Sequence, residues 1–372
     1  MSLHTTSGLR VTLVLGGGGL KGLAHIGVFR ALEERGVSVA LAIGTSMGAL
    51  IAGAWASGMP IREMAARARL VRRRHVFQVA HVDMALRRMN SPAIYRREPL
   101  DELITSLIGE VRFDDLWRPL LVNTVDLHAG RQVFWGMVGR RDARVRDAVY
   151  ASCALPGMFP PRTIGDRTYV DGAVIENLAV RLAGVLSPDP VIAVNLTAMG
   201  TVRTPAETTG FAATYARGLE IVMQSQIEGN LRGWHGPPLL LIEPKVSGVP
   251  MFAFNRTGSL VAEGHRATLE ALDSLTTPLD KLDGGLHPRR NVTVRVDPEL
   301  CIGCRLCATR APAVFRMEGD KAVVIQEAHE WGPVPAPYVS DCPTAAIKVE
   351  TEGRSESPSP AAPLPRSPGR RP

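Results

Sequence analysis

The sequence predicts an α/β fold built on a parallel sheet, followed by a small second domain. Three observations predict it. Apolar segments of strand length alternate with helical patterns from the N-terminus onward, and two glycine motifs fall in consecutive turns from strand to helix. Four of the five cysteines lie in the last fifth of the chain, which marks a separate unit.

The first elements expected are a strand over Arg10–Leu15, a helix over Gly22–Arg35, a strand over Val39–Ile43 and a helix over Met47–Ser57. Further strands are expected over 119–125, 132–135, 190–195 and 238–242, with helices over 142–152, 208–230 and 257–275. Pro and Gly then mark a linker. We therefore expect a first domain over 1–280, a linker over 281–290, a second domain over 291–350 and a disordered tail over 351–372.

The composition bounds the location and the partners of the protein. Of its 372 residues 45% are hydrophobic, and the net charge of +7 permits a polyanionic partner without demanding one. No segment has the roughly 18 apolar residues of a membrane-spanning helix, and the N-terminus lacks the pattern of a secretion signal. We expect a cytoplasmic protein whose contact with the inner membrane is at most peripheral.

The first glycine motif follows the first strand. Gly17, Gly19 and Gly22 satisfy G-x-G-x-x-G, a pattern found in dinucleotide sites, but a glycine loop also aims bare N–H groups at a developing oxyanion. A dinucleotide site needs an acidic residue about 20 positions later, at the end of the second strand. That strand runs instead into Gly44-Thr45-Ser46-Met47-Gly48, so the oxyanion interpretation is favoured.

This second motif is G-x-S-x-G between a strand and a helix. Gly44 and Gly48 permit a sharp turn that exposes the hydroxyl of Ser46 as a nucleophile at a helix N-terminus. An isolated match arises easily by chance, whereas two glycine motifs in consecutive turns do not. The oxyanion-hole donors expected are the N–H groups of Gly17, Gly18, Gly19 and Met47.

A nucleophilic serine needs a base, and none of the nine histidines carries a catalytic signature. A better candidate is Asp171, which a short strand delivers into a glycine turn at Gly172. Asp-Gly is also an ordinary turn signal, so the residues alone leave both interpretations open.

Together these motifs resemble those of the patatin-like phospholipases, in the same order: Gly17–Gly22, Gly44–Gly48, residues 151–161 and Asp171–Ala173. The resemblance covers about residues 8–275 and implies a three-layer α/β/α hydrolase. It also implies a Ser46–Asp171 dyad that cleaves acyl esters of phospholipids or lysophospholipids, with Lys21, Gly22 and Gly172 supporting the motifs. Leu20, Ala173 and the missing proline after Asn177 depart from the family pattern and leave the substrate fit open.

The segment 62–97 interleaves many arginines with apolar residues. A basic amphipathic helix of this kind lies on an anionic membrane surface, but a solvated helical face has the same pattern. No nucleic-acid-binding motif accompanies the charge, so we expect no nucleic-acid partner.

The cysteines begin with C-x₂-C-x₂-C at Cys301, Cys304 and Cys307, as in bacterial ferredoxins, and Cys342-Pro343 follows at a distance. A Cys₄ zinc site is the alternative, although zinc ribbons pair their cysteines two and two. The pattern over about 291–350 resembles single-cluster ferredoxins. The resemblance implies a small α+β domain with one 4Fe–4S cluster held by these four cysteines.

The sequence thus predicts a serine-dependent lipid acyl hydrolase with an attached iron–sulfur domain for electron transfer or redox sensing, which implies a redox partner. The alternative is a redox sensor or electron carrier whose patatin-like domain only binds lipid.

Overall fold

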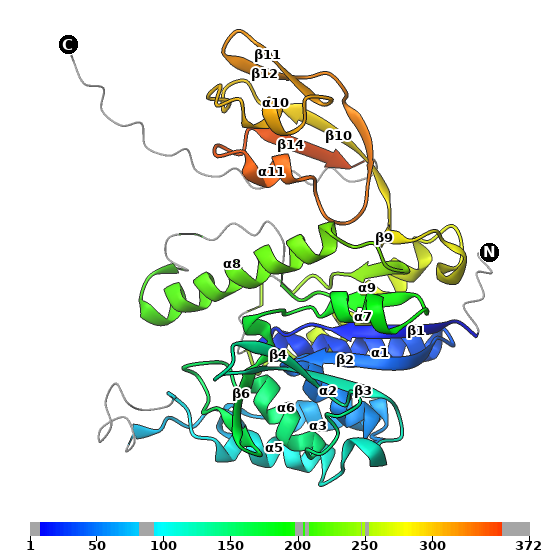
Figure 1. Cartoon of the computed structure of the whole chain (residues 1–372), viewed down its shortest axis with the longest axis vertical. Helices are drawn as coiled ribbons and strands as arrows, with labels where there is room; N and C mark the ends of the chain where they lie inside the picture. The colour runs from blue at the N-terminus through cyan, green and yellow to red at the C-terminus, as the bar shows by residue number, and fades with distance from the viewer. Residues whose placement is uncertain are drawn as a thin grey trace. The chain divides into compact units, whose positions relative to one another are not determined.

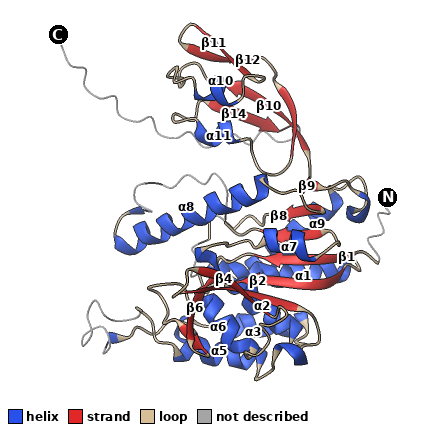
Figure 2. Ribbon diagram, viewed as in Figure 1, coloured by secondary structure: helices blue, strands red, loops and turns tan. Residues whose placement is uncertain are grey.

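The computed structural model describes residues 8–81, 93–197, 204, 208–246, 248–249 and 253–351. The chain divides into two compact units, and it passes from the larger to the smaller between Pro288 and Arg289. The larger unit contains a nine-stranded sheet, and the smaller contains a three-stranded and a two-stranded sheet (Figure 1). Helices flank the large sheet, as the predicted α/β class requires (Figure 2).

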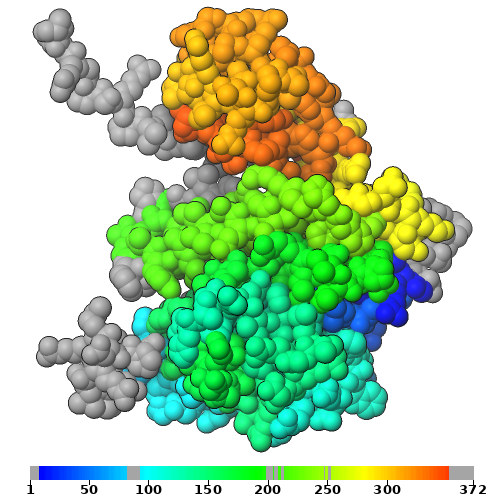
Figure 3. Space-filling model, viewed as in Figure 1, coloured from blue at the N-terminus to red at the C-terminus, as the bar shows by residue number. Residues whose placement is uncertain are grey.

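The strands of the larger unit are β1 (Arg10–Leu15), β2 (Ser38–Thr45), β3 (Leu120–Asp126), β4 (Arg131–Trp135), β5 (Arg162–Ile164), β6 (Arg167–Asp171), β7 (Val191–Val194), β8 (Pro238–Ile242) and β9 (Gly285–His287). Its helices are α1 (Ala24–Glu34), α2 (Met47–Ala56), α3 (Ile61–Leu70), α5 (Glu98–Ile108), α6 (Val145–Cys153), α7 (Val180–Leu186), α8 (Phe211–Arg232) and α9 (Thr257–Asp273). Helix α8 runs along the surface of this unit (Figure 3). Its side chains Ile221 and Val222 are half exposed.

The large sheet has the strand order β5-β6-β3-β2-β1-β7-β8-β9, and β4 also pairs with β3. The pairs from β3 through β9 are parallel, as the opening βαβ pattern predicts, whereas β4, β5 and β6 add antiparallel pairs. The sheet is therefore mixed, with its antiparallel part at one end.

Strand β3 has three partners on two edges. Its residues 124–126 pair with both β4 and β6, and its residues 122–123 pair with both β4 and β2. Strand β4 thus occupies one edge, and β2 and β6 share the other. They meet end to end there, because Thr45 is in register with Asn123 and Asp171 with Thr124.

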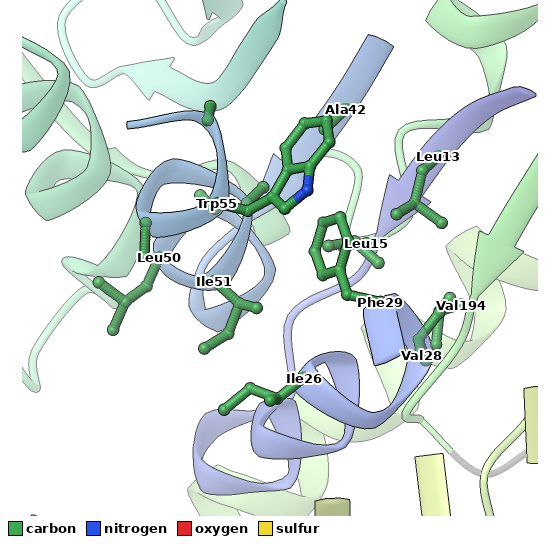
Figure 4. Close-up of a cluster of buried hydrophobic side chains, with 14 of the residues drawn as sticks. Leu13, Leu15, Ile26, Val28, Phe29, Ala42, Leu50, Ile51, Trp55 and Val194 are labelled. Atoms are coloured by element: carbon green, nitrogen blue, oxygen red, sulfur yellow. The ribbon is translucent and has the colours of Figure 1, made fainter. Parts of the chain in front are cut away.

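The main core lies between β1 and the first helices. Leu13 and Leu15 are fully buried and pack with side chains of α1 and α2, among them Phe29 and Trp55 (Figure 4). The rings of Phe29 and Trp55 stack with centroids 5.0 Å apart. This packing fixes the helices that follow the two glycine motifs.

The arginine-rich segment is not the continuous helix that the sequence suggested. Helix α3 ends at Leu70, a short 3₁₀ turn covers Arg73–His75, and Val79 bridges to Tyr95 in extended conformation. On a continuing helix Arg69 and Arg73 would lie four residues apart on one face, and like charges at that spacing disfavour the helix. Residues 82–92 of the segment lie outside the described residues.

Part of the stretch expected as a linker, 281–290, belongs to the large sheet. Strand β9 pairs with β8 and places Leu286 opposite Leu239. These residues extend the sheet by one strand and therefore do not form part of a linker. The predicted tail lies outside the described residues apart from Thr351, which ends the last strand. No helix within the described ranges is long and apolar enough to cross a bilayer.

The smaller unit consists of β10 (Arg290–Val296), α10 (Leu306–Arg310), β11 (Phe315–Glu318), β12 (Lys321–Val324), β13 (Ala328–Trp331), α11 (Pro337–Asp341) and β14 (Ile347–Thr351). Its strands form the antiparallel sheets β13-β10-β14 and β11-β12. The unit has its own core of Val294, Phe315, Tyr338 and Ile347.

Candidate active site

Ser46 stands in a sharp turn between β2 and α2. Its φ of +55° lies in the region that residues other than glycine rarely adopt, and such a conformation costs about 1–3 kcal/mol. The flanking glycines allow the turn to pack: a Cβ on Gly48 would lie 2.2 Å from the carbonyl oxygen of Leu15, and one on Gly44 would lie 2.5 Å from Ala49. The G-x-S-x-G spacing therefore has a steric cause.

The glycine loop packs directly against this turn. A Cβ on Gly22 would lie 2.1 Å from Cγ of Met47, and one on Gly17 would lie 3.0 Å from Cβ of Ser46. Lys21 is buried within the loop's 3₁₀ turn (Gly19–Leu23). The two glycine motifs are thus brought together, as their consecutive positions in the sequence suggested.

The N–H groups of the loop differ in availability. Gly17 donates its N–H to Oδ1 of Asn177 at 2.9 Å, so this group already has an acceptor. This removes Gly17 from the set of expected oxyanion donors. No backbone acceptor engages the N–H groups of Gly18, Gly19 or Met47 in the part of the chain that the structure describes, and Met47 begins α2, where the first N–H groups have no partner within the helix.

Asp171 ends β6 with a side chain only 1% exposed. Its Oδ1 accepts the N–H of Ala173 at 2.9 Å. Burial raises the pKa of Asp171 to about 7, against the opposing effects of the hydrogen bonds from Ala173 N–H and from the Ser46 side chain. A carboxyl with this pKa exchanges its proton near neutral pH, as a general base must.

Ser46 and Asp171 lie at one cavity with the glycine loop and a wall of apolar side chains. The wall draws on α2, α3, α5, α8 and the residues that flank the 3₁₀ turn at 73–75. It includes Leu50, Ile51, Met64, Phe77, Leu107 and Met223. Cys153 also lines it, and burial raises the pKa of its thiol well above the usual value. The cavity has a polar reacting end and room for an apolar chain.

No histidine lines the described part of this cavity. His25 is fully buried behind the loop, with Nε2 at 2.8 Å from the carbonyl oxygen of Gly16. Burial lowers the pKa of His25 to about 4, so its ring is neutral at physiological pH. His25 therefore supports the loop from behind.

A second cavity, in the smaller unit, is lined by all four clustered cysteines: Cys301, Cys304, Cys307 and Cys342. Gly303 has a φ of +69°, and a Cβ there would lie 2.3 Å from the carbonyl oxygen of Asp320. Although burial opposes ionisation of the Cys342 thiol, hydrogen bonds from backbone N–H groups, including Ala346, leave its pKa below the usual value. Among the described residues, no three His, Cys, Asp or Glu side chains are grouped as a site for a metal ion. The four thiols and these N–H groups nevertheless fit the donor chemistry of an iron–sulfur cluster.

Comparison with known families agrees with this geometry. Residues 13–183 match the model of the patatin-like phospholipases. The chain contains a patatin-like phospholipase domain. Residues 296–349 match the 4Fe-4S single cluster domain of ferredoxin I, so a single-cluster ferredoxin domain follows the patatin-like domain.

Curated relatives match about half of this chain. An uncharacterized NTE family protein of Mycobacterium tuberculosis is 33% identical over 196 residues, which are 53% of this chain and 51% of that protein. Lysophospholipase nte1 of Emericella nidulans is 31% identical over 51% of this chain and 12% of its own length. The chain spans about half the length of the first of these curated relatives. The solved structure of VipD from Legionella pneumophila aligns over 72% of this chain and 67% of its own, at 14% identity and a TM-score of 0.37.

Three buried polar residues of the patatin-like domain were not assigned a role from the sequence. Asn177 holds Gly17, while Asn123 and Ser152 contact the segments on either side of the reacting groups. Asn177 follows Asp171 by six positions and could have been found from that proximity. Nothing local in the sequence singles out the other two, because their contacts depend on strand register.

Proposed function

We propose that the patatin-like domain is a serine-dependent lipid acyl hydrolase. The observation that carries the proposal is that Ser46, Asp171 and the glycine loop line one apolar cavity, with the N–H groups of Gly18 and Gly19 unbonded to any backbone acceptor among the described residues. In this proposal the Oγ of Ser46 attacks the ester carbonyl while Asp171 accepts the hydroxyl proton. The N–H groups of Gly18, Gly19 and Met47 then stabilise the oxyanion, aided by the dipole of α2.

The second half of the reaction uses the same groups. Collapse of the tetrahedral intermediate breaks the ester C–O bond, and protonated Asp171 returns the proton to the leaving alcohol. A water molecule, deprotonated by Asp171, then attacks the acyl-enzyme. Protonated Asp171 returns that proton to Oγ of Ser46 as the bond to the acyl group breaks, which releases the fatty acid and free Ser46. No histidine is required at any step, because the raised pKa of Asp171 allows its carboxyl to both accept and return a proton near neutral pH.

The apolar wall favours a fatty acyl chain as the group transferred. The relative named a lysophospholipase supports a glycerophospholipid with one acyl chain as the ester, and the match to the patatin-like phospholipases supports one with two. We therefore propose phospholipids or lysophospholipids as substrates.

Variants of Ser46 and Asp171, with a matched serine control, test the proposal. Ser46→Ala and Asp171→Asn are expected to abolish hydrolysis of lysophosphatidylcholine, and Ser46→Ala also to abolish covalent labelling by a fluorophosphonate. Ser274→Ala, at the exposed end of α9, is the control and keeps both activities. Full hydrolysis by the Ser46→Ala protein would refute the assignment.

The arginine-rich segment supports a peripheral membrane contact at the same cavity. Val71, Val76 and Phe77 line the cavity, while the same segment exposes Leu70 to 69% and carries four exposed arginines at 69, 72, 73 and 74. Within the described ranges no Asp or Glu pairs with these four, in contrast to Arg67, which pairs with Glu63. We propose that these arginines contact phosphates of an anionic lipid surface while the acyl chain enters the cavity.

Vesicle co-sedimentation tests this contact. The wild-type protein is expected to bind vesicles that contain phosphatidylglycerol more tightly than vesicles of phosphatidylcholine alone. Replacing Arg72, Arg73 and Arg74 by Gln removes the difference without changing hydrolysis of a soluble short-chain ester, whereas Arg131→Gln, an exposed arginine of β4, preserves the difference. Equal binding of both vesicles by the wild-type protein would contradict the proposal.

For the ferredoxin domain we propose one 4Fe–4S cluster held by Cys301, Cys304, Cys307 and Cys342, with an electron-carrying protein as partner. Such a cluster supplies one-electron transfer when bound. The chain contributes four thiols and backbone N–H groups that favour the thiolate of Cys342.

A further inference from the structure

We propose that Asn123 and Ser152 are positioning residues that set the relative placement of Ser46 and Asp171. This inference rests on the proposed dyad, and it concerns how the chain brings two residues 125 positions apart into reacting distance.

The starting point is the junction on β3. Strands β2 and β6 share one edge of β3 and run toward each other, so Thr45 and Asp171 end opposite the neighbouring residues Asn123 and Thr124. Ser46 follows Thr45 directly, and the turn that starts at Gly172 follows Asp171. The strand register therefore brings both reacting groups to the same point of the sheet.

The side chain of Asn123 spans this junction. Its Nδ2 donates to Oγ1 of Thr45 at 3.0 Å and to the carbonyl oxygen of Glu176 at 2.8 Å. One fully buried amide thus forms hydrogen bonds both to Thr45, which precedes the nucleophile, and to Glu176 in the loop that follows the base. Its Oδ1 accepts Nε2 of Gln132 at 3.0 Å, which fixes the orientation of the amide.

Gly172 shows how closely the amide approaches the base. A Cβ on Gly172 would lie 2.4 Å from Cγ and 2.5 Å from Nδ2 of Asn123. The glycine after Asp171 is therefore required by contact with Asn123 and not by an unusual φ. The amide and the turn are packed as one unit.

Ser152, on α6, connects the same strand to the nucleophile. Its Oγ donates to the backbone carbonyl oxygen of Asn123 at 2.7 Å and accepts the N–H of Ser46 at 2.8 Å. The side chain is fully buried. Since the φ of Ser46 is +55°, this bond holds the strained turn in the orientation that presents Oγ to Asp171.

Loss of these contacts is predicted to lower the rate of the chemical step and not only the stability of the fold. Without the Ser152 hydroxyl or the Asn123 amide, the Ser46 turn is free to shift, and a displacement of about 1 Å costs about 100-fold in rate. The hydrogen bond from Ser46 also lowers the pKa of Asp171, so its loosening moves that pKa upward. A purely structural role would change the melting temperature but leave kcat per folded molecule and the pH profile intact.

The experiment measures kcat, KM and the pH profile of kcat/KM on a soluble ester, with the rate of fluorophosphonate labelling. Ser152→Ala and Asn123→Ala are expected to lower kcat and labelling about tenfold to 100-fold with KM little changed, and to raise the apparent pKa. Ser152→Thr, which keeps the hydroxyl, restores most of the rate. Ser152→Cys, whose sulfur is a weaker hydrogen-bonding group, gives an intermediate loss and replaces Ser152→Ala should that protein not fold.

The control is Thr268→Ala in α9. Thr268 is fully buried and its hydroxyl bonds within its own helix, to Gly264 at 2.8 Å, so its loss lowers stability without altering kcat or the pH profile. Wild-type kcat, labelling and pH profile in the Ser152 and Asn123 variants, with an inactive Ser46→Ala protein, would overturn this inference alone. An active Ser46→Ala protein would instead overturn the dyad.

Discussion

The buried carboxyl of Asp171 should make the protein less stable as the pH rises, and Asp171→Asn should remove this effect. In the folded protein the pKa of Asp171 is about 7, against an ordinary value of 3.8. Between these pH values the folded state binds the proton and the unfolded state has lost it. The free energy of unfolding therefore falls as the pH rises through this window, and the destabilisation is complete above about pH 7.

The difference between the folded-state pKa of about 7 and the ordinary value of 3.8 sets the magnitude. At about 1.4 kcal/mol per unit, ionised Asp171 costs about 4 kcal/mol of folding free energy at pH 8 and almost nothing at pH 4. Asparagine carries no charge, and its Oδ1 still accepts the N–H of Ala173. Asp171→Asn is thus expected to match the wild-type stability at pH 4 and to exceed it by up to about 4 kcal/mol at pH 8.

Guanidinium unfolding followed by tryptophan fluorescence, at several pH values between 4 and 8.5, measures this difference. Asp126→Asn is the matched control of opposite sign, because the N–H of Ala129 and Arg167 lower the pKa of Asp126. Its stabilising effect is present above pH 3.8 and is lost as the pH falls through the lowered pKa, so Asp126→Asn is less stable than the wild type at pH 8. An Asp171→Asn protein no more stable than wild type at pH 8, or a difference independent of pH, would refute the reasoning.

Three further outcomes are expected. The kcat/KM for a neutral ester rises about tenfold from pH 6 to pH 8 with a midpoint near 7, because Asp171 must be ionised to accept a proton; a flat profile would argue against it as base. Gly48→Ala suppresses fluorophosphonate labelling because its Cβ would lie 2.2 Å from the carbonyl oxygen of Leu15, whereas Gly218→Ala, with open space around it, labels normally; equal labelling would contradict the steric argument. Cys342→Ser lowers the iron and sulfide content after anaerobic reconstitution, and unchanged content would remove Cys342 from the ligand set.

The sequence was most informative where function depends on local backbone geometry. The Ser46 turn and the glycine loop follow from residues a few positions apart, since only glycine fits the approaches at Gly22 and Gly48. The α/β class followed from the same alternation of strands and helices. These features need no knowledge of long-range pairing.

Long-range contacts could not be predicted in this way. That Gly17 donates its N–H to Asn177 depends on two loops 160 positions apart, so the sequence overcounted the free donors. The role of Asn123 depends on which strands share an edge of β3, which periodicity does not encode. The sequence did not predict that α3 ends at Leu70, because its helical periodicity continues beyond that residue. In the structure Val71, Val76 and Phe77 line the cavity and do not extend the helix.

Because β2 and β6 meet end to end, strand pairing can change the relative positions of Ser46 and Asp171 only in steps of whole residues. Successive residues of a strand are about 3.3 Å apart and point to opposite faces, so a one-residue slip of either strand would separate the reacting oxygens by a full step and invert a side chain. Intermediate spacings are unavailable through pairing alone. Fine adjustment of this centre must therefore come from substitutions in the surrounding turns, while insertions within the three strands would abolish it outright.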